Sequence, residues 1–202
     1  MKIQYLFLLT FLIGLLSCNT FYSTKIEPDT KIKFDIAYFT KHKNYNIAID
    51  TLRHGTIITL IDGNYYSENI KKVNSPYSIN YRFYKNSYNI RSSGTSFYDA
   101  ATGIYNEYDE NGKIVKSIDY NNIYKFSIQD LIALFKSKYK IDLTTSKDIV
   151  HVVSTYRNNT NIQITPEYTI LIRGKSPKFR QIKVNGINGK IILDLSIQSF
   201  EF

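Results

Sequence analysis

The chain has 202 residues, a length that suits one domain of ordinary size or two small ones. Hydrophobic residues make up 43% and aromatic residues 15% of it, which excludes disorder of the whole chain. The formal net charge is +9, but the basic residues are scattered along the sequence. The scatter favours a compositional origin of the charge over a basic patch for nucleic acid or an anionic membrane.

The first eighteen residues have the pattern of a secretory signal that leads into a cysteine. Lys2 supplies a positive charge, residues 5–16 form an almost unbroken apolar run, and Ser17-Cys18 follows. The run is too short to span a bilayer comfortably. Its end resembles a bacterial lipobox, which implies that residues 1–17 are removed and Cys18 is acylated. The alternative is an ordinary secretory signal whose apolar region contains a cysteine.

Cys18 is the only cysteine of the chain. The folded part therefore has no internal disulfide, no thiolate metal cluster and no cysteine nucleophile. Each buried acyl methylene contributes about 0.8 kcal/mol, so several chains on one residue make a durable anchor. We expect residues 18–30, which are polar, to be a tether. We also expect a location in the bacterial cell envelope, with a membrane bound through Cys18 and no nucleic acid partner.

Alternation of apolar and polar residues predicts strands in residues 31–125. The pattern in Tyr77–Tyr84 places Tyr77, Ile79, Tyr81 and Phe83 on one face. Turn signals separate these segments, with Asp62-Gly63-Asn64 among them. The expected strands are 31–39, 46–51, 56–61 and 77–84; residues 40–46 are expected to form a polar turn, and residues 65–73 are ambiguous.

Residues 103–120 predict a hairpin, because two arms with alternating apolar residues flank Asn111-Gly112, a pair that supplies the positive φ angles of a tight turn. Residues 81–93 can be aligned with residues 105–117. In this alignment Tyr88 takes the place of the turn glycine. A repeat of this kind is typical of β-hairpin arrays.

The stretch GIYNEYDENGKI resembles MORN-type hairpin repeats, in the variant found in antitoxin-like bacterial MORN proteins. Residues 74–143 as a whole look like a group of uncharacterised lipoproteins from the Bacteroidetes. The resemblance covers one good repeat and one degenerate repeat, and the chain departs from the pattern in lacking Trp and in having Tyr88 at a turn. It implies hairpin architecture and, in a sharper version, an immunity or antitoxin-like factor.

Residues 126–202 predict a helix followed by an antiparallel meander. Ser127 is the expected N-cap, and Asp130 takes the capping-box position. The helix is expected to present one apolar face: Ile128, Leu131, Ile132, Phe135 and Tyr139. Strands are expected at 149–156, 168–173, 179–184 and 190–197. The segment FRQIKVNGINGKIILD resembles the closing hairpin of PepSY-type domains, which implies a small binding or inhibitory module.

No stretch of the sequence has a catalytic, cofactor-binding or metal-binding motif. His42, His54 and His151 lack the spacing of metal ligands. The densest carboxylates are better explained as turn or strand-end residues than as a glycosidase pair; they are Asp99, Asp109, Glu110 and Asp119. We therefore expect a protein without an enzymatic site, a metal or a cofactor.

Tyrosines in the hairpin region are the remaining candidates for a site. Tyr84, Tyr105 and Tyr108 form a contact surface if they face solvent, whereas they fill the core if they face inward. The expected fold class is α+β: mostly antiparallel sheet with MORN-like hairpins in residues 31–125, then one main helix packed on a C-terminal meander in residues 126–202. The expected function is a non-enzymatic, lipid-anchored envelope protein that binds another protein. The alternatives are a structural envelope component and a hydrolase whose site is not visible in the sequence.

Overall fold

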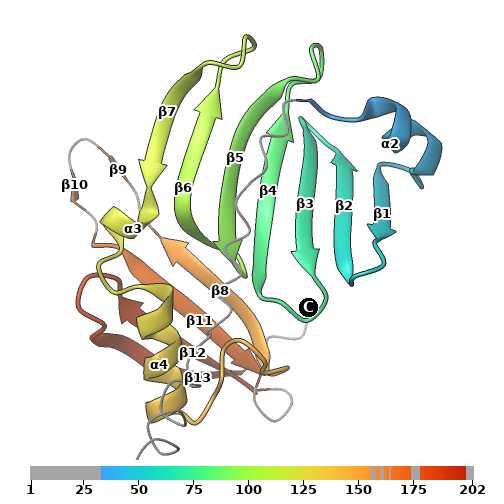
Figure 1. Cartoon of the computed structure of the whole chain (residues 1–202). Helices are drawn as coiled ribbons and strands as arrows, with labels where there is room; N and C mark the ends of the chain where they lie inside the picture. The colour runs from blue at the N-terminus through green and yellow to red at the C-terminus, as the bar shows by residue number, and fades with distance from the viewer. Residues whose placement is uncertain (1–32, 156–157, 160–161, 164, 174–177, 199–202) are drawn as a thin grey trace, which may run out of the picture.

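The computed structural model describes residues 33–155, 158–159, 162–163, 165–173 and 178–198. The expected signal segment, the tether and Cys18 lie outside these residues. The described chain is mostly antiparallel β-structure in two main sheets with few helices, which agrees with the α+β expectation (Figure 1).

The larger sheet has seven antiparallel strands that follow one another in chain order. Each strand therefore pairs with the strand before it, as expected when turn signals recur at short intervals. The strands are β1 (Ile47–Thr51), β2 (Thr56–Asp62), β3 (Tyr66–Lys72), β4 (Tyr77–Phe83), β5 (Ile90–Phe97), β6 (Ala100–Tyr108) and β7 (Ile114–Asp119). The segment 65–73, ambiguous in the sequence, thus contains a strand.

One expected strand is wrong. Residues 36–42 form helix α2 (Ile36–His42), where a strand over residues 31–39 and a turn over residues 40–46 were expected. Asp35 is the N-cap, and its side chain accepts a hydrogen bond from the Tyr38 backbone N–H at 2.9 Å. The cap explains the difference: an aspartate that satisfies an amide of the first turn favours a helix start over the extended pattern.

Helix α2 helps to cover one face of the larger sheet, the covered face. Phe39 is only 1% exposed, and the ring of Phe34 stacks on Tyr66 with centroids 4.5 Å apart. Burial of each such ring contributes about 1.5–3 kcal/mol. The predicted alternation of β4 is confirmed here, since Ile79, Tyr81 and Phe83 are all buried in this cluster.

The two predicted repeat units are both hairpins, β4–β5 and β6–β7. Tyr88 adopts φ +60° and Gly112 adopts φ +83°, so both turns use a left-handed residue at the matched position. In the first strands of the two hairpins, β4 and β6, the pairing with the second strand differs by one residue from the predicted alignment. Phe83 pairs with Ile90, whereas Tyr108 pairs with Ile114. Because neighbouring strand residues face opposite sides, this shift places residues that align in sequence on different faces.

The smaller sheet has the strand order β13-β12-β11-β8 and is the predicted meander. Its strands are β8 (Ile149–Thr155), β11 (Glu167–Arg173), β12 (Lys178–Asn185) and β13 (Ile191–Gln198). A two-stranded ribbon of β9 (Asn158–Asn159) and β10 (Ile162–Gln163) lies between β8 and β11 in the sequence.

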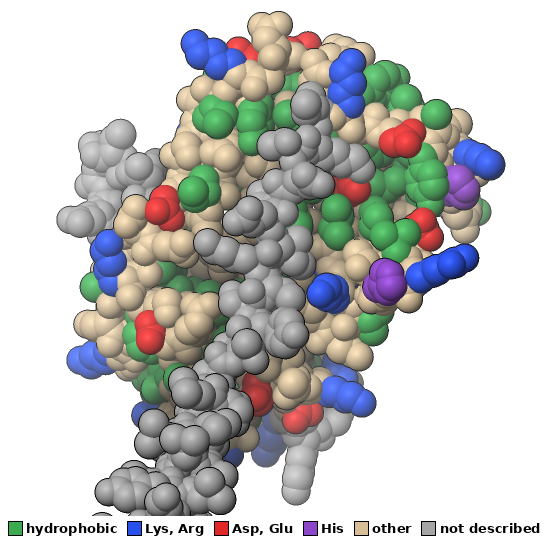
Figure 2. Space-filling model, in the orientation of Figure 1, with side chains coloured by type: hydrophobic (Ala, Val, Ile, Leu, Met, Phe, Trp, Pro, Cys, Tyr) green, Lys and Arg blue, Asp and Glu red, His purple; other side chains and the backbone are tan. Residues whose placement is uncertain are grey.

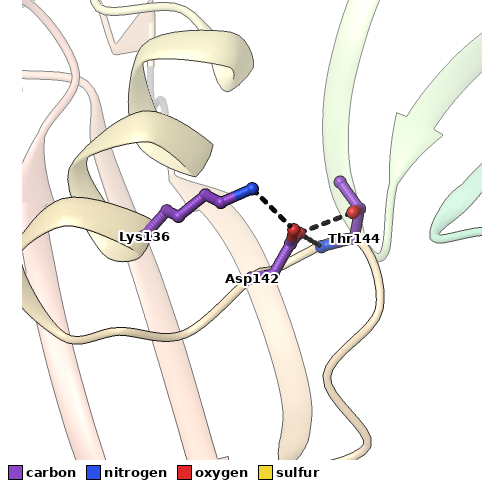
Figure 3. A network of polar contacts seen from close by, with 3 residues as sticks. All are labelled: Lys136, Asp142 and Thr144. Atoms are coloured by element: carbon purple, nitrogen blue, oxygen red, sulfur yellow. Dashed lines mark hydrogen bonds and ion pairs between the residues drawn. The ribbon is translucent and has the colours of Figure 1, made fainter.

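Helix α4 (Ile128–Lys138) begins as predicted with a capping box between Ser127 and Asp130. Ile128, Leu131 and Phe135 are buried against the smaller sheet. The chain leaves the helix through a polar network in which the Asp142 carboxylate accepts from Thr144 N at 3.0 Å, Thr144 Oγ1 at 2.6 Å and Lys136 Nζ at 3.4 Å (Figure 3). The Thr144 bonds hold the pKa of Asp142 below its usual range.

The two sheets meet at the β5–β6 hairpin. Asp99 N donates to Val152 O at 3.0 Å, and Ala101 N donates to Ser154 Oγ at 3.0 Å. Phe97 of β5 lies in the same buried cluster as α4 and the smaller sheet. The short helix α3 (Tyr120–Ile123) leads from β7 towards α4, and Tyr124 directly after it joins the cluster. The expected division at residue 126 stays a prediction, and this shared cluster crosses it.

Candidate functional site

The face of the larger sheet opposite the covered face is called the open face here. Registers between the strands align its residues in three rows that cross the sheet; Gly94 and Tyr105 are joined by proximity at the β5–β6 register shift. Paired residues of antiparallel strands lie on the same face, so the rows can be followed from strand to strand. The first row is Ile47, Ile61, Ser67, Arg82, Ser92, Glu107 and Lys116; the second is Ile49, Thr59, Asn69, Asn80, Gly94, Tyr105 and Ile118; the third is Thr51, Ile57, Lys71, Ser78, Ser96 and Ala101.

A hydrogen-bonded ladder of serine and asparagine side chains occupies the centre of the open face. Ser78 and Ser96 lie 2.8 Å apart, and the Asn80 amide nitrogen donates to both at 3.3 and 3.1 Å. Asn69 completes the ladder by donating to Asn80 Oδ1 at 2.7 Å. These bonds hold the side chains in one arrangement, so this part of the face is rigid before any ligand arrives.

A shallow groove of about 320 Å³ lies over this ladder, and we call it the Arg82 groove. Pockets of roughly this size are at the lower end of those that bind small molecules or single side chains. Gly94 forms part of its wall, and a side chain there would come within 3.1 Å of the Tyr105 ring. The lining residues include Asn80, Arg82, Ser92, Ser96, Asp99, Tyr105 and Tyr120.

Arg82 is exposed, and among the described residues no carboxylate lies within ion-pair distance of it. Its cross-strand neighbours Ser67 and Ser92 are neutral. The nearest carboxylate of its row, Glu107, is two strands away, which is about 10 Å. Glu107 is also paired already with Lys116 at 3.4 Å. Asp99 also lines the groove, but its ion-pair partner is His151. Within the described residues, Arg82 therefore presents a guanidinium without an ion-pair partner to the groove.

An aspartate–histidine pair borders the groove where the two sheets meet. His151 Nδ1 lies 2.6 Å from Asp99 Oδ2, and both side chains are about half exposed. Such a pair orients an imidazole, but base catalysis of acyl transfer also needs a hydroxyl or thiol beside the second ring nitrogen. In the part of the chain that the structure describes, no hydroxyl group is hydrogen-bonded to His151. The geometry does not complete a triad.

The other predicted histidines lie apart. His42 Nδ1 lies 2.9 Å from Tyr38 O at the end of α2, and His54 is exposed in the β1–β2 turn. No group of three His, Cys, Asp or Glu side chains within the described ranges could hold a metal ion. Asp109 accepts bonds from the Asn111 and Lys113 amides, and Asp119 caps α3, so their expected turn and strand-end positions are confirmed.

The three predicted contact tyrosines do not share one face. The Tyr84 hydroxyl donates to Tyr108 O at 2.7 Å, which brings these two residues together. The hydroxyl of Tyr108 lies 3.1 Å from Ser93 Oγ on the covered face, whereas Tyr105 lies on the open face. All three are half-buried. Whether they act as a contact surface stays a prediction, and of the three only Tyr105 lines the Arg82 groove.

A second cavity, of about 200 Å³, lies on the covered face beside α2 and contains three carboxylates. Tyr38 Oη donates to Asp50 Oδ2 at 2.6 Å, and this bond raises the pKa of Tyr38. Asp35 caps α2, and Glu68 is only 2% exposed. We call this space the acidic cavity; Figure 2 shows hydrophobic and acidic side chains together on this side of the molecule. Two of its three carboxylates accept hydrogen bonds that hold α2 in place.

Of the Arg82 groove, sequence reasoning named Tyr105 as a contact candidate but missed the polar residues of β4, although their signal was present. The strand 77–84 was interpreted through its apolar residues, but the same alternation places Ser78, Asn80 and Arg82 together on the opposite face. In the described residues, no helix is both long and apolar enough to cross a membrane. No family model, curated protein or solved structure matches this chain.

Proposed function

We propose that the protein is a non-enzymatic, lipid-anchored component of the bacterial cell envelope that acts by binding another protein through its open face. The observation that supports this proposal is the chemistry of that face. It combines exposed aliphatic residues at β1 and β2, a rigid polar centre and an unpaired arginine.

Ile49 and Ile61 carry the aliphatic part of the open face. Ile49 is 68% exposed and Ile61 is 36% exposed, and together with Ile47 they form a contiguous apolar end of the face. Protein interfaces typically combine apolar and aromatic residues with arginine. Contiguous exposed apolar residues are also more typical of interaction sites than of surface that contacts only solvent.

The hairpins β4–β5 and β6–β7 serve, in this proposal, as MORN-like units that extend the sheet and so widen the open face. The left-handed residues Tyr88 and Gly112 at matched turn positions support this interpretation. The sharper version of the proposal is an immunity or antitoxin-like factor, whose partner is a toxin that reaches the envelope. An envelope protein that only spaces layers needs no such chemically varied face.

Membrane attachment is proposed to occur through acyl chains on Cys18, which follows an apolar signal-like run. The polar residues 19–30 then separate the lipid from the folded part. This arrangement leaves the sheet accessible to a partner in the envelope.

Affinity capture from intact envelopes, with two matched variants, tests the proposal. Ile49→Lys places a charge on the open face, and Leu195→Lys places the same charge at a similarly exposed aliphatic position of the smaller sheet, where Leu195 is 51% exposed. We expect a specific partner protein to be captured by the parent and by Leu195→Lys but lost with Ile49→Lys. Equal capture by both variants, or no specific protein with the parent, contradicts the proposal.

The acidic cavity favours a hydrolase as a second candidate function. Asp35, Asp50 and Glu68 line it, and paired carboxylates are the usual groups of glycoside hydrolysis. Turnover of a polysaccharide substrate by the purified protein, abolished by Asp50→Asn in a folded variant, identifies this activity. Unchanged turnover in Asp50→Asn removes the acidic cavity as its site.

A further inference from the structure

The open face carries more positive than negative charge. Lys71, Arg82 and Lys116 are the cations of its three rows, and Glu107 is their carboxylate. Asp99, which also lines the Arg82 groove, lies 2.6 Å from His151. Because Glu107 pairs with Lys116, the positive charges of Lys71 and Arg82 are left over. Both are exposed, and the described part of the chain offers neither of them a carboxylate within ion-pair distance. Like charges without counter-ions on a rigid surface favour an anionic partner.

The spacing of the two cations matches an extended polypeptide. Lys71 pairs with Ser78, and Arg82 lies four residues further along β4 than Ser78. At about 3.4 Å per residue, the two positions are about 14 Å apart along the strand direction. An extended segment that follows β3 and β4 places its residues i and i+4 at this separation and on the same side.

The surroundings of Arg82 favour a polypeptide over an anionic saccharide. In the same row, Ile61 lies two strands from Arg82, which is about 10 Å, and Ile47 follows beyond it. On the other side, the rings of Tyr105 and Tyr120 border the groove. Aliphatic side chains of a bound polypeptide can pack on the isoleucines on one side of Arg82 and on the tyrosine rings on the other. A chain of hydroxylated sugars would leave the isoleucines without apolar contacts.

We propose that the Arg82 groove and the neighbouring part of the open face bind an acidic polypeptide segment of the partner. One Asp or Glu of that segment pairs with Arg82, a second carboxylate meets Lys71, and an aliphatic side chain packs on Ile47, Ile49 and Ile61. The inference rests on the proposed function, because it names the chemistry of the partner that the open face binds. Guanidinium groups favour this role, since they bind carboxylates through two parallel hydrogen bonds.

Selection of short random peptides displayed on phage against the full chain tests the inference without knowledge of the natural partner. We expect selected peptides to be enriched in Asp or Glu at positions four apart and to contain an aliphatic residue. Arg82→Gln should weaken their binding about tenfold or more. Arg173→Gln, which removes the same charge from an exposed position of the smaller sheet, should leave the affinity unchanged. The affinity for the parent should fall with increasing salt, and this dependence should be smaller for Arg82→Gln.

A charge exchange gives the decisive measurement. A selected peptide in which the critical Asp or Glu is replaced by Lys should lose binding to the parent and regain it with Arg82→Glu. Selection of peptides without acidic residues, equal affinity of Arg82→Gln and the parent, or failure of the exchange overturns the inference. The inference is also overturned if no peptide is selected and the protein instead binds polygalacturonate in a way that Arg82→Gln abolishes. The anionic partner would then be a saccharide. If a captured partner binds Arg82→Gln as well as the parent, the inference fails while the proposed function stands.

Discussion

Gly189 lies in the turn between β12 and β13, where the structure leaves no room for a side chain. Its φ is +72°, and a Cβ atom at this position would lie 2.3–2.7 Å from three ring atoms of Phe126. Carbon atoms in contact are normally about 3.5–4.0 Å apart, so the Cβ atom would overlap the ring by more than an ångström. The Phe126 backbone is held in place, because its N–H donates to Gly186 O at 2.9 Å and its carbonyl accepts from Tyr168 Oη at 3.0 Å, so the overlap can be relieved only by displacing the ring from its packing against the core.

Gly189→Ala is therefore expected to lower the free energy of unfolding by about 2–4 kcal/mol. About 1 kcal/mol comes from the left-handed backbone, which costs any residue other than glycine. Displacement of the packed ring adds about 1–3 kcal/mol, the usual cost of overpacking. Gly112 provides the matched control, because its φ is +83° but nothing lies within 4 Å of its Cβ position. Gly112→Ala should cost about 1 kcal/mol, and Gly112→Val somewhat more than that.

Urea denaturation followed by circular dichroism measures both losses, and tyrosine emission can serve as the second probe because the chain has no Trp. The double variant Gly189→Ala with Phe126→Ala isolates the overlap. Removal of the ring should make the alanine at 189 cost only about as much as the alanine at 112, because the clash is then absent. Equal losses for Gly189→Ala and Gly112→Ala in the parent would refute the steric argument, and an unchanged midpoint for Gly112→Val would show that this loop is not a tight hairpin.

Three further outcomes are expected. Hydrogen bonds from Arg180 hold the pKa of Asp194 below its usual range. The stability that the Asp194 carboxylate contributes is therefore present above its unfolded pKa of about 4 and is lost as the pH falls below that value. Asp194→Asn should make the denaturation midpoint less dependent on pH in this acid range. Burial raises the pKa of Tyr139 to about 12, so stability should fall as the pH rises from about 10 to about 12. Burial raises the pKa of Tyr168 as well, so Tyr139→Phe should reduce this loss without abolishing it. Cys18→Ser should abolish metabolic labelling with a fatty acid, and equal labelling of variant and parent would exclude the lipid anchor.

Local sequence patterns were sufficient wherever a single short-range rule acts. The capping box at Ser127 and Asp130 predicted the start of α4, because the two residues satisfy each other's backbone amides within one turn. The alternation in Tyr77–Phe83 predicted that Ile79, Tyr81 and Phe83 share a buried face, although Ser78 on the opposite face is buried as well. The turn at Asn111-Gly112 was predicted for the same reason, since only few residues tolerate its backbone angles.

Residues whose role depends on distant partners were misassigned. Phe34, Ile36 and Tyr38 alternate along the sequence as in a strand, but the cap at Asp35 and the burial of Phe39 favour a helix over residues 36–42. The tyrosines of the two hairpins align in sequence, yet a difference of one residue between the turns places Tyr81 on the covered face and Tyr105 on the open face.

Periodicity and turn residues by themselves determined most strands of the two sheets and the position of the main helix, while the anchor at Cys18 stays a prediction. These features arise from interactions within a few residues, so a linear pattern contains them. The tertiary structure alone decided that Arg82 has no counter-ion within the described part of the chain. Its charge is left over because Ser67 and Ser92 flank it and Glu107 is held by Lys116 two strands away. The distances that decide such pairing are set by the register between strands, and register is a property of the assembled sheet.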